Sequence, residues 1–255
     1  MRVPLLALAA CFAAFASGCG HAPGYPPSPV VRPTEVTDFA TLYSENCAAC
    51  HGANGQNGPA MDLANPEYQA LVDDAALRKW ISNGMPGTQM PAFAQSAGGM
   101  LTDAQVNALI AGMRKAWSQP NVFQGATPPP YAQSAAGDSA HGQQVYAARC
   151  ASCHQWGHQD ITGTNYLSLV SDQALRSIII AGRPDIHQMD WRMERQAAIV
   201  GAANGNSTPQ EFVHPLSDQD VSDIVTYLGS LRGLAPAQAA NAAATQPAPA
   251  ATAGK

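Results

Sequence analysis

Two stretches of this 255-residue chain follow one plan, and this internal repeat constrains the fold more than any other feature. The segment YQALVDDAALRKWISNG, from Tyr68 to Gly84, aligns without a gap with YLSLVSDQALRSIIIAG, from Tyr166 to Gly182. Each copy is preceded by a CxxCH pentapeptide, CAACH in the first and CASCH in the second, and is followed by a second apolar-periodic segment. A repeat of this length predicts two similar domains in tandem.

Each copy is expected to be helical, and neither contains a convincing hairpin signal. The last segment of each copy opens with a typical N-cap residue, Thr102 or Ser217, and continues with apolar residues at helical spacing. The middle segment of each copy ends in glycine, Gly84 or Gly182, which is typical of a helix C-terminus. The pattern therefore predicts an all-α chain.

Composition places the boundaries. The chain opens with Arg2 and an apolar run too short for a membrane span, which is typical of a secretory signal. Pro-, Gly- and Ser-rich stretches indicate a tether and a linker, and the Ala/Pro/Gln-rich end indicates disorder. The predicted organisation is a signal peptide at 1–18, a tether at 19–35, a first domain at 36–118, a linker at 119–137, a second domain at 138–233 and a disordered tail at 234–255.

Cys19 is a candidate lipidation site. The small residues Ala16-Ser17-Gly18 before it resemble a bacterial lipobox, although Ala16 stands where a lipobox usually has leucine. The alternative is a plain signal peptide followed by a chance cysteine. No other apolar run is long enough to span a bilayer. We therefore expect an exported protein that is lipid-anchored through Cys19 on the periplasmic face of a bacterial membrane.

Charge and size limit what the domains can do. Charged residues make up 12% of the chain and the net charge is −5, which argues against a nucleic-acid partner because such partners need clustered Lys and Arg. Each predicted domain has fewer than a hundred residues and few large apolar side chains, so it is short of core. Something beyond the polypeptide should fill the centre of each domain.

The two pentapeptides have the spacing of c-type haem attachment sites. Two thiols three positions apart lie on one helical turn, where each can form a thioether with a haem vinyl group, and the adjacent histidine can bind the iron. A redox-active disulfide or half of a zinc site needs no histidine directly after the second cysteine, and neither predicts one motif at the same place in two repeats. The sequence thus predicts two covalent haem c groups, held by Cys47, Cys50 and His51 and by Cys150, Cys153 and His154.

With these motifs in place, both halves resemble class I c-type cytochromes, and the whole resembles a di-haem c-type cytochrome of the lipoprotein subunit type of bacterial respiratory chains. The resemblance covers residues 36–233. It implies two tandem helical domains, each wrapped around a haem c, with the first helix packed across the last. Tyr43 and Tyr146, four residues before each first cysteine, fit that contact. It also implies a respiratory membrane complex as partner, either a quinol-oxidising assembly or a terminal oxidase.

In that family the second axial ligand is usually a methionine well downstream, often followed by proline. Met90, in the sequence MPAF, matches this pattern and is the expected ligand of the first iron. Met85 is also followed by proline and is the alternative. The structural interpretation is that both methionines only fill gaps in the core. A thioether ligand raises the reduction potential of the haem.

The repeat breaks at the corresponding place in the second half. Gln188 stands where the alignment places Met90, and glutamine is a poor ligand for haem iron. A shift of one residue makes Met189 the first candidate and His187 the second, with bis-histidine ligation and a lower potential in the latter case. Met193 is a more distant choice, and an open five-coordinate iron is the remaining one.

Two further departures indicate that the second pocket is remodelled. The link between the Met189 region and the last helix, 192–214, is much longer than its counterpart in the first half. The loop after His154 is also shorter than the loop after His51. His158 and His214 lie in these regions, and we expect both to be surface histidines.

Two haems favour an electron carrier over an enzyme, because electron transfer needs neither a catalytic base nor a substrate pocket. The alternatives are a di-haem peroxidase and a haem-based ligand sensor. Both need an open position on one iron, which the ambiguous second site allows. The chain is short for such a peroxidase and shows no clear acid/base constellation.

Overall fold

The structure is a computed structural model that describes residues 31–154, 160–193 and 214–233. The chain divides into two compact units, Met1–Glu35 and Val36–Lys255, and the described part of the first contains the short 3-10 helix η1 (Pro33–Glu35). No strand occurs in the described ranges, which hold isolated β-bridges instead, and the fold is all-α as predicted. None of the described helices has the length and apolar character needed to cross a membrane.

Several predicted features lie outside the described residues. They are the signal peptide, the tether up to residue 30, Cys19, His158, the tail and most of the long link after Arg192.

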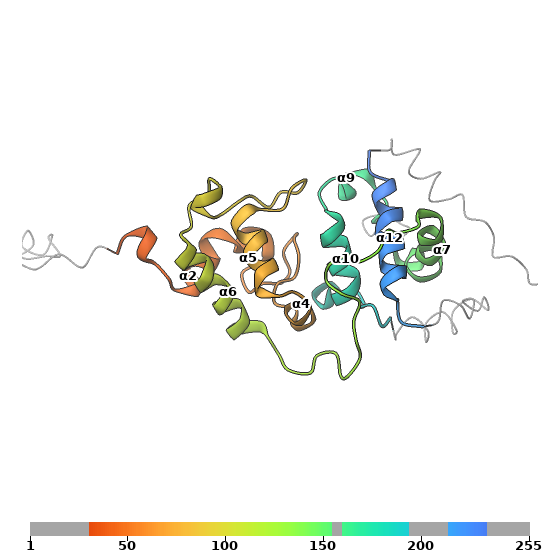
Figure 1. The fold of residues 1–255 in the computed structure, drawn as a ribbon, viewed down its shortest axis with the longest axis horizontal. Coiled ribbons are helices and arrows are strands. Elements are labelled where there is room, and N and C mark those ends of the chain that lie inside the picture. Colours follow the sequence, from red (N-terminus) through yellow and green to blue (C-terminus); the bar gives the residue numbers. More distant parts are fainter. Residues whose placement is uncertain (1–30, 155–159, 194–213, 234–255) are drawn as a thin grey trace, which may run out of the picture. The chain divides into compact units, whose positions relative to one another are not determined.

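The helices of Val36–Lys255 repeat in one order (Figure 1). The first half contains α2 (Phe39–Asn46), α3 (Ala48–His51), α4 (Pro66–Leu71), α5 (Asp74–Asn83), η2 (Gln95–Ala97) and α6 (Asp103–Trp117). The second half contains α7 (Ser139–Arg149), α8 (Ala151–His154), α9 (Thr164–Leu167), α10 (Asp172–Ala181), η4 (Pro184–Ile186) and α12 (Asp218–Ser230). Each half has its own cluster of buried apolar residues.

The predicted starts of the last helices are confirmed. The Thr102 hydroxyl accepts the Gln105 backbone N–H at 3.3 Å, and the Gln105 side chain accepts the Thr102 N–H at 3.0 Å. Ser217 and Asp220 make the same reciprocal pair at 3.1 and 2.8 Å. These capping boxes satisfy backbone donors that would otherwise be unpaired at the start of α6 and α12.

The predicted glycine ends are also confirmed. Gly84 and Gly182 follow α5 and α10 with φ of +69° and +70°. The next segment passes close to each: a Cβ would lie 2.7 Å from the Met90 carbonyl oxygen at Gly84 and 2.9 Å from that of Gln188 at Gly182. Only glycine combines this backbone conformation with so close an approach.

The first and last helices of each half cross at a glycine, with large and small residues exchanged between the halves. In the first half Gly112 of α6 faces the ring of Phe39 on α2, and a Cβ would overlap that ring. In the second half Gly142 of α7 lies against the Asp223 carbonyl of α12. Aligned on the CxxCH motifs, Gly142 is equivalent to Phe39, and aligned on the N-caps, Tyr227 is equivalent to Gly112. The glycine of the crossing thus lies on the last helix in the first half and on the first helix in the second.

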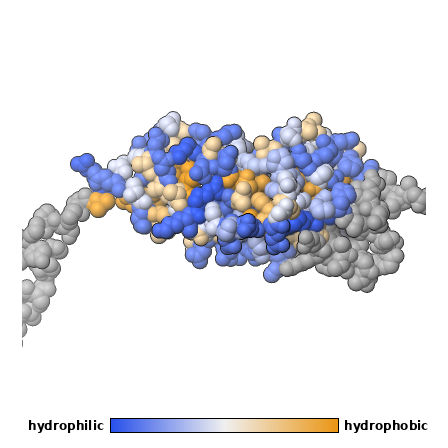
Figure 2. Space-filling view, turned by 60° about the horizontal axis from the view of Figure 1, so that its bottom comes forward, coloured by the Kyte–Doolittle hydropathy of each residue, from blue (hydrophilic) through white to orange (hydrophobic). Residues whose placement is uncertain are grey.

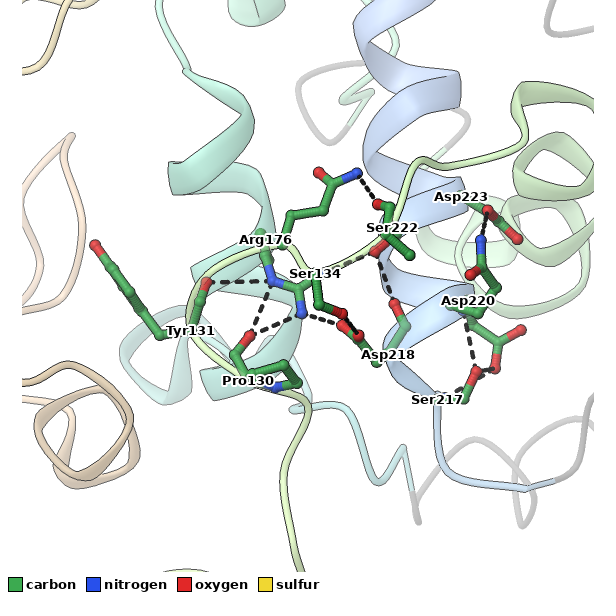
Figure 3. Close-up of polar contacts among 12 residues, drawn as sticks. Pro130, Tyr131, Ser134, Arg176, Ser217, Asp218, Asp220, Ser222 and Asp223 are labelled. Carbon is green, nitrogen blue, oxygen red and sulfur yellow. Dashed lines mark hydrogen bonds and ion pairs between the residues drawn. The ribbon is translucent and has the colours of Figure 1, made fainter.

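Hydrogen bonds from a helix of the second half hold the middle of the predicted linker (Figure 3). Arg176 of α10 is 1% exposed and donates to the Pro130 carbonyl at 2.7 and 2.9 Å and to the Tyr131 carbonyl at 3.2 Å. Its guanidinium also pairs with Asp218 and bonds Ser222 at 3.2 Å. Arg176 of α10 thus binds two linker carbonyls and two residues of α12, which holds the linker beside the contact between these helices.

The equivalent arginine of the first half shows what the linker adds. Arg78 of α5 bonds Asn107 of α6, which is equivalent to Ser222, but Arg78 is exposed. The same arginine position is therefore a surface contact in one half and a buried anchor in the other. Composition gives no sign of this difference, because the acceptors are backbone carbonyls.

We expect Gly142→Ala to lower the melting temperature of the haem-loaded protein. The added Cβ would overlap the Asp223 carbonyl and push α7 away from α12, an overpacking that typically costs about 1–3 kcal/mol. Gly229→Ala on α12 is the matched control, since its Cβ would meet nothing closer than a side-chain atom at 3.5 Å. The control should be neutral or stabilised by up to about 1 kcal/mol. Calorimetry measures the melting temperatures of both variants. An unchanged melting temperature of Gly142→Ala would contradict the close approach of α7 to α12.

Candidate haem sites

The first CxxCH motif forms a single helical turn. The Cys47 carbonyl accepts the N–H groups of Cys50 at 3.2 Å and His51 at 3.0 Å, which sets both thiols and the imidazole on one turn. The Nδ1 atom of His51 lies 2.8 Å from the Met61 carbonyl oxygen. If Nδ1–H donates to this carbonyl, Nε2 is left as the free ligand atom, an arrangement typical of metal-binding histidines.

The protonation preferences of this turn suit metal ligation. Burial lowers the pKa of His51; the hydrogen bond to Met61 opposes this and the positive charge of Arg183 adds to it. The neutral imidazole, which is the form that binds iron, is therefore favoured. Burial, helped by the neighbouring Cys50, raises the pKa of Cys47 to about 11, and burial raises that of Cys150 to about 12. Thiol–disulfide enzymes depend on lowered cysteine pKa values, so a redox disulfide fits poorly.

The second motif repeats the turn. The Cys150 carbonyl accepts the N–H groups of Cys153 at 3.1 Å and His154 at 3.0 Å. The Tyr146 hydroxyl donates to the His154 carbonyl at 3.1 Å, whereas Tyr43 donates to the carbonyl of Gly52 at 2.9 Å. Both tyrosines therefore tie the first helix of their half to the end of the CxxCH turn. Their rings also contact the last helix, as inferred from the sequence: the centroids lie 5.3 Å apart for Tyr43 and Trp117 and 5.5 Å apart for Tyr146 and Tyr227.

The two methionines of the first half have different surroundings. Met90 is half-buried and packs against the same apolar cluster as Cys47 and Met61. The sulfur of Met85 accepts a hydrogen bond from the Ser171 hydroxyl at 2.9 Å. Met85 is thus engaged with the N-cap residue of α10 in the second half, which favours Met90 as the ligand candidate.

Gln188 occupies the position of Met90, as the repeat alignment indicates. The Arg183 N–H donates to the Gln188 carbonyl at 3.1 Å, and the Met85 N–H donates to the Met90 carbonyl at the same distance. The Gln188 side chain donates to the carbonyl of Ile178 at 3.3 Å. This amide is therefore bonded to the backbone of the preceding helix α10.

The remaining candidates of the second half lie close in sequence but differ in burial. His187 is exposed, with a left-handed φ of +64°. Met189 is half-buried, and Met193 is half-buried and packs against the same cluster as Cys150. His214 is exposed, as expected for a surface histidine.

The residues present suit a haem. Trp191 is 7% exposed, and its indole N–H is one of the two buried side-chain polar atoms without a hydrogen-bond partner within the described ranges. Such a donor can pair with a haem carboxylate. Apolar residues reach the surface between hydrophilic ones (Figure 2), and Ile186, beside His187, is 58% exposed. Within the same ranges no three His, Cys, Asp or Glu side chains gather as a metal site.

Two groups at the candidate haem sites were not predicted from the sequence, the Met61 carbonyl and the Trp191 indole. The Met61 carbonyl holds His51, but any residue supplies a carbonyl, so no sequence signal could have revealed it. Trp191 stands in the ligand segment, and its unpartnered N–H becomes evident only once its burial is known.

Comparison with known proteins gives two family matches. Residues 139–232 match the family described as cytochrome c, and residues 34–111 match the family described as cytochrome c oxidase, cbb3-type, subunit III. A cbb3-type cytochrome c oxidase subunit FixP from Sinorhizobium medicae is 24% identical over 226 residues, covering 81% of this chain and 64% of that protein. The chain thus spans somewhat under two thirds of the length of this relative.

Two other relatives match single regions. The dihydro-heme d1 dehydrogenase of Pseudomonas aeruginosa is 40% identical over 75 residues, which cover 29% of this chain and 14% of that enzyme. A cytochrome c6 from a Picosynechococcus species is 28% identical over 93 residues, 36% of this chain and 73% of that protein.

We expect each CxxCH turn to carry one covalent haem. The unaltered chain should hold two haems per polypeptide by pyridine haemochrome assay, and Cys47→Ala with Cys50→Ala should hold one, because the thioether sites of the first turn are lost. The matched control, Cys150→Ala with Cys153→Ala, should also hold one. Two haems retained in either double variant would contradict the assignment.

Proposed function

Since the chain belongs to the c-type cytochromes and carries two domains of that family, we propose that it is a di-haem electron carrier. The observation that best supports this proposal is the pair of equivalent CxxCH turns, each tied by a tyrosine to the first helix of its half. Bound haem c supplies reversible one-electron chemistry. The polypeptide holds the cofactor, orients its ligands and excludes water, and no acid/base residue is required.

In the first half we assign Cys47 and Cys50 to the thioethers and His51 and Met90 to the iron. The hydrogen bond from His51 to Met61 favours a neutral, oriented imidazole, and Met90 packs against the same core as Cys47. A thioether ligand would favour ferrous iron and a high potential.

In the second half we assign Cys150 and Cys153 to the thioethers and His154 to the iron. Met189 is our first choice for the sixth ligand, and His187 is the alternative. The half-burial of Met189 supports this order, because His187 is exposed.

The partner we propose is a respiratory membrane complex, either a quinol-oxidising assembly or a terminal oxidase. The support is the similarity to proteins named as cbb3-type cytochrome c oxidase subunits. A lipid on Cys19 would hold the carrier on the periplasmic face of a bacterial membrane, where such complexes present their electron-transfer sites.

Met90→Ala should remove the methionine-to-iron charge-transfer band of one haem from the near-infrared spectrum of the oxidised chain. It should also lower the potential of that haem, because the thioether is lost. Met85→Ala is the matched control and should keep both properties, since its sulfur is engaged by Ser171. Loss of the band in Met85→Ala, with retention in Met90→Ala, would reverse the assignment.

The electron-carrier proposal predicts closed iron sites. Carbon monoxide should leave the spectrum of the reduced chain unchanged, hydrogen peroxide should not be consumed catalytically, and ferricyanide should withdraw two electrons per chain. Met90→Ala serves as a positive control, because its opened iron should bind one carbon monoxide per chain. Carbon monoxide binding or peroxide turnover by the unaltered chain would instead favour a sensor or a peroxidase built on the second haem.

A further inference from the structure

Arg183 and Asp185, in the ligand segment of the second half, form a buried two-point ion pair. The Arg183 Nε and Nη2 atoms donate to the two carboxylate oxygens of Asp185 at 2.9 and 2.8 Å. The exposed fractions of the two side chains are 8% and 0%. A paired guanidinium and carboxylate of this kind hold each other in one orientation.

The same pair binds the haem loop of the first half. Arg183 Nη1 donates to the Ala60 carbonyl at 2.9 Å, and Nη2 donates to the Gly58 carbonyl at 3.2 Å. Asp185 accepts the backbone N–H of Asn57 at 2.9 Å. The loop between Asn57 and Ala60 is thus held by three hydrogen bonds from a segment more than a hundred residues later in the chain.

This loop sets the position of His51. The Ala60 N–H donates to the Cys50 carbonyl at 3.0 Å, so one residue joins the CxxCH turn to Arg183. The next residue, Met61, supplies the carbonyl 2.8 Å from His51 Nδ1. A movement of Ala60 would therefore change the hydrogen bond to the imidazole.

The first half has no counterpart to this contact. Met85 and Gly87 stand at the positions equivalent to Arg183 and Asp185, and neither carries a charge. The contact therefore runs in one direction, from the ligand segment of the second half to the histidine of the first.

We propose that Arg183 is a positioning residue for His51, acting through the Ala60 and Met61 carbonyls, and that it tunes the first haem from the second half. The inference rests on the proposed haem at His51. The hydrogen bond to the second imidazole nitrogen fixes the ring orientation and raises the basicity of the ligand. A more basic imidazole favours ferric iron, so a looser loop should raise the potential of the first haem.

Arg183→Lys in the full haem-loaded chain tests this. Lysine keeps the positive charge but not the planar fork that reaches Asp185, Gly58 and Ala60 together. We expect a changed pattern of haem-methyl proton shifts at the first haem of the oxidised protein and an upward shift of its potential. The methyl signals are assigned to that haem through Overhauser contacts with the thioether protons of Cys47 and Cys50.

Arg192→Lys is the matched control. Arg192 also spans the two halves, pairing with Glu67 and Asp190, but none of its bonds reaches the Asn57–Met61 loop. It should leave the first haem unchanged. Equal effects of both variants would mean a general loosening of the halves, and no effect of Arg183→Lys would mean that the loop is fixed without it; either result overturns the proposal.

Asp185→Asn is the second variant, in case Arg183→Lys does not fold. This variant keeps Arg183 but removes the carboxylate charge that orients its guanidinium. We therefore expect an upward shift of the potential of the first haem here too. An unchanged first haem in this variant overturns the proposal. The proposed function is checked separately: if the unaltered chain carries no haem at Cys47 and Cys50, the haem assignment itself fails.

Discussion

The close crossing of the first and last helices in each half is the constraint on which the rest depends. Each half is too small to build a large core alone, so its terminal helices must meet while leaving room for an apolar cofactor. A glycine at each crossing achieves this: Gly112 lies against the Phe39 ring in the first half, and Gly142 lies against the Asp223 backbone in the second. The first helix carries the tyrosine that donates a hydrogen bond to the end of the CxxCH turn, so helix packing helps to place the histidine proposed as iron ligand.

Much of this architecture could be predicted because it is encoded locally. The N-caps Thr102 and Ser217 and the stop glycines Gly84 and Gly182 act through their own backbone neighbours, and the structure confirms each of them. The repeat and its motifs predicted two cytochrome c domains in an all-α chain, which the family matches and the helices confirm. The same alignment predicted that Gln188 is equivalent to Met90, and the backbone hydrogen bonds of the two residues confirm it.

What the sequence could not reveal depends on backbone acceptors and distant partners. The Met61 carbonyl at His51, the linker carbonyls bound by Arg176, and the loop bound by Arg183 all use groups that every residue possesses. Composition predicted a linker at 119–137 and gave no sign that a buried arginine binds it at Pro130 and Tyr131. The sixth ligand of the second iron stays a prediction. The candidates His187, Met189 and Met193 lie within a few residues and differ in burial, but each has a side chain that can bind haem iron.

Electron paramagnetic resonance of the fully oxidised, full-length chain tests the central claim most directly. We propose two irons, each closed by two protein ligands, in a protein that only passes electrons. It predicts low-spin ferric signals that integrate to two haems per chain, with no high-spin component. A high-spin ferric signal amounting to one haem per chain would contradict it, because one iron would then have a position open to a ligand or substrate.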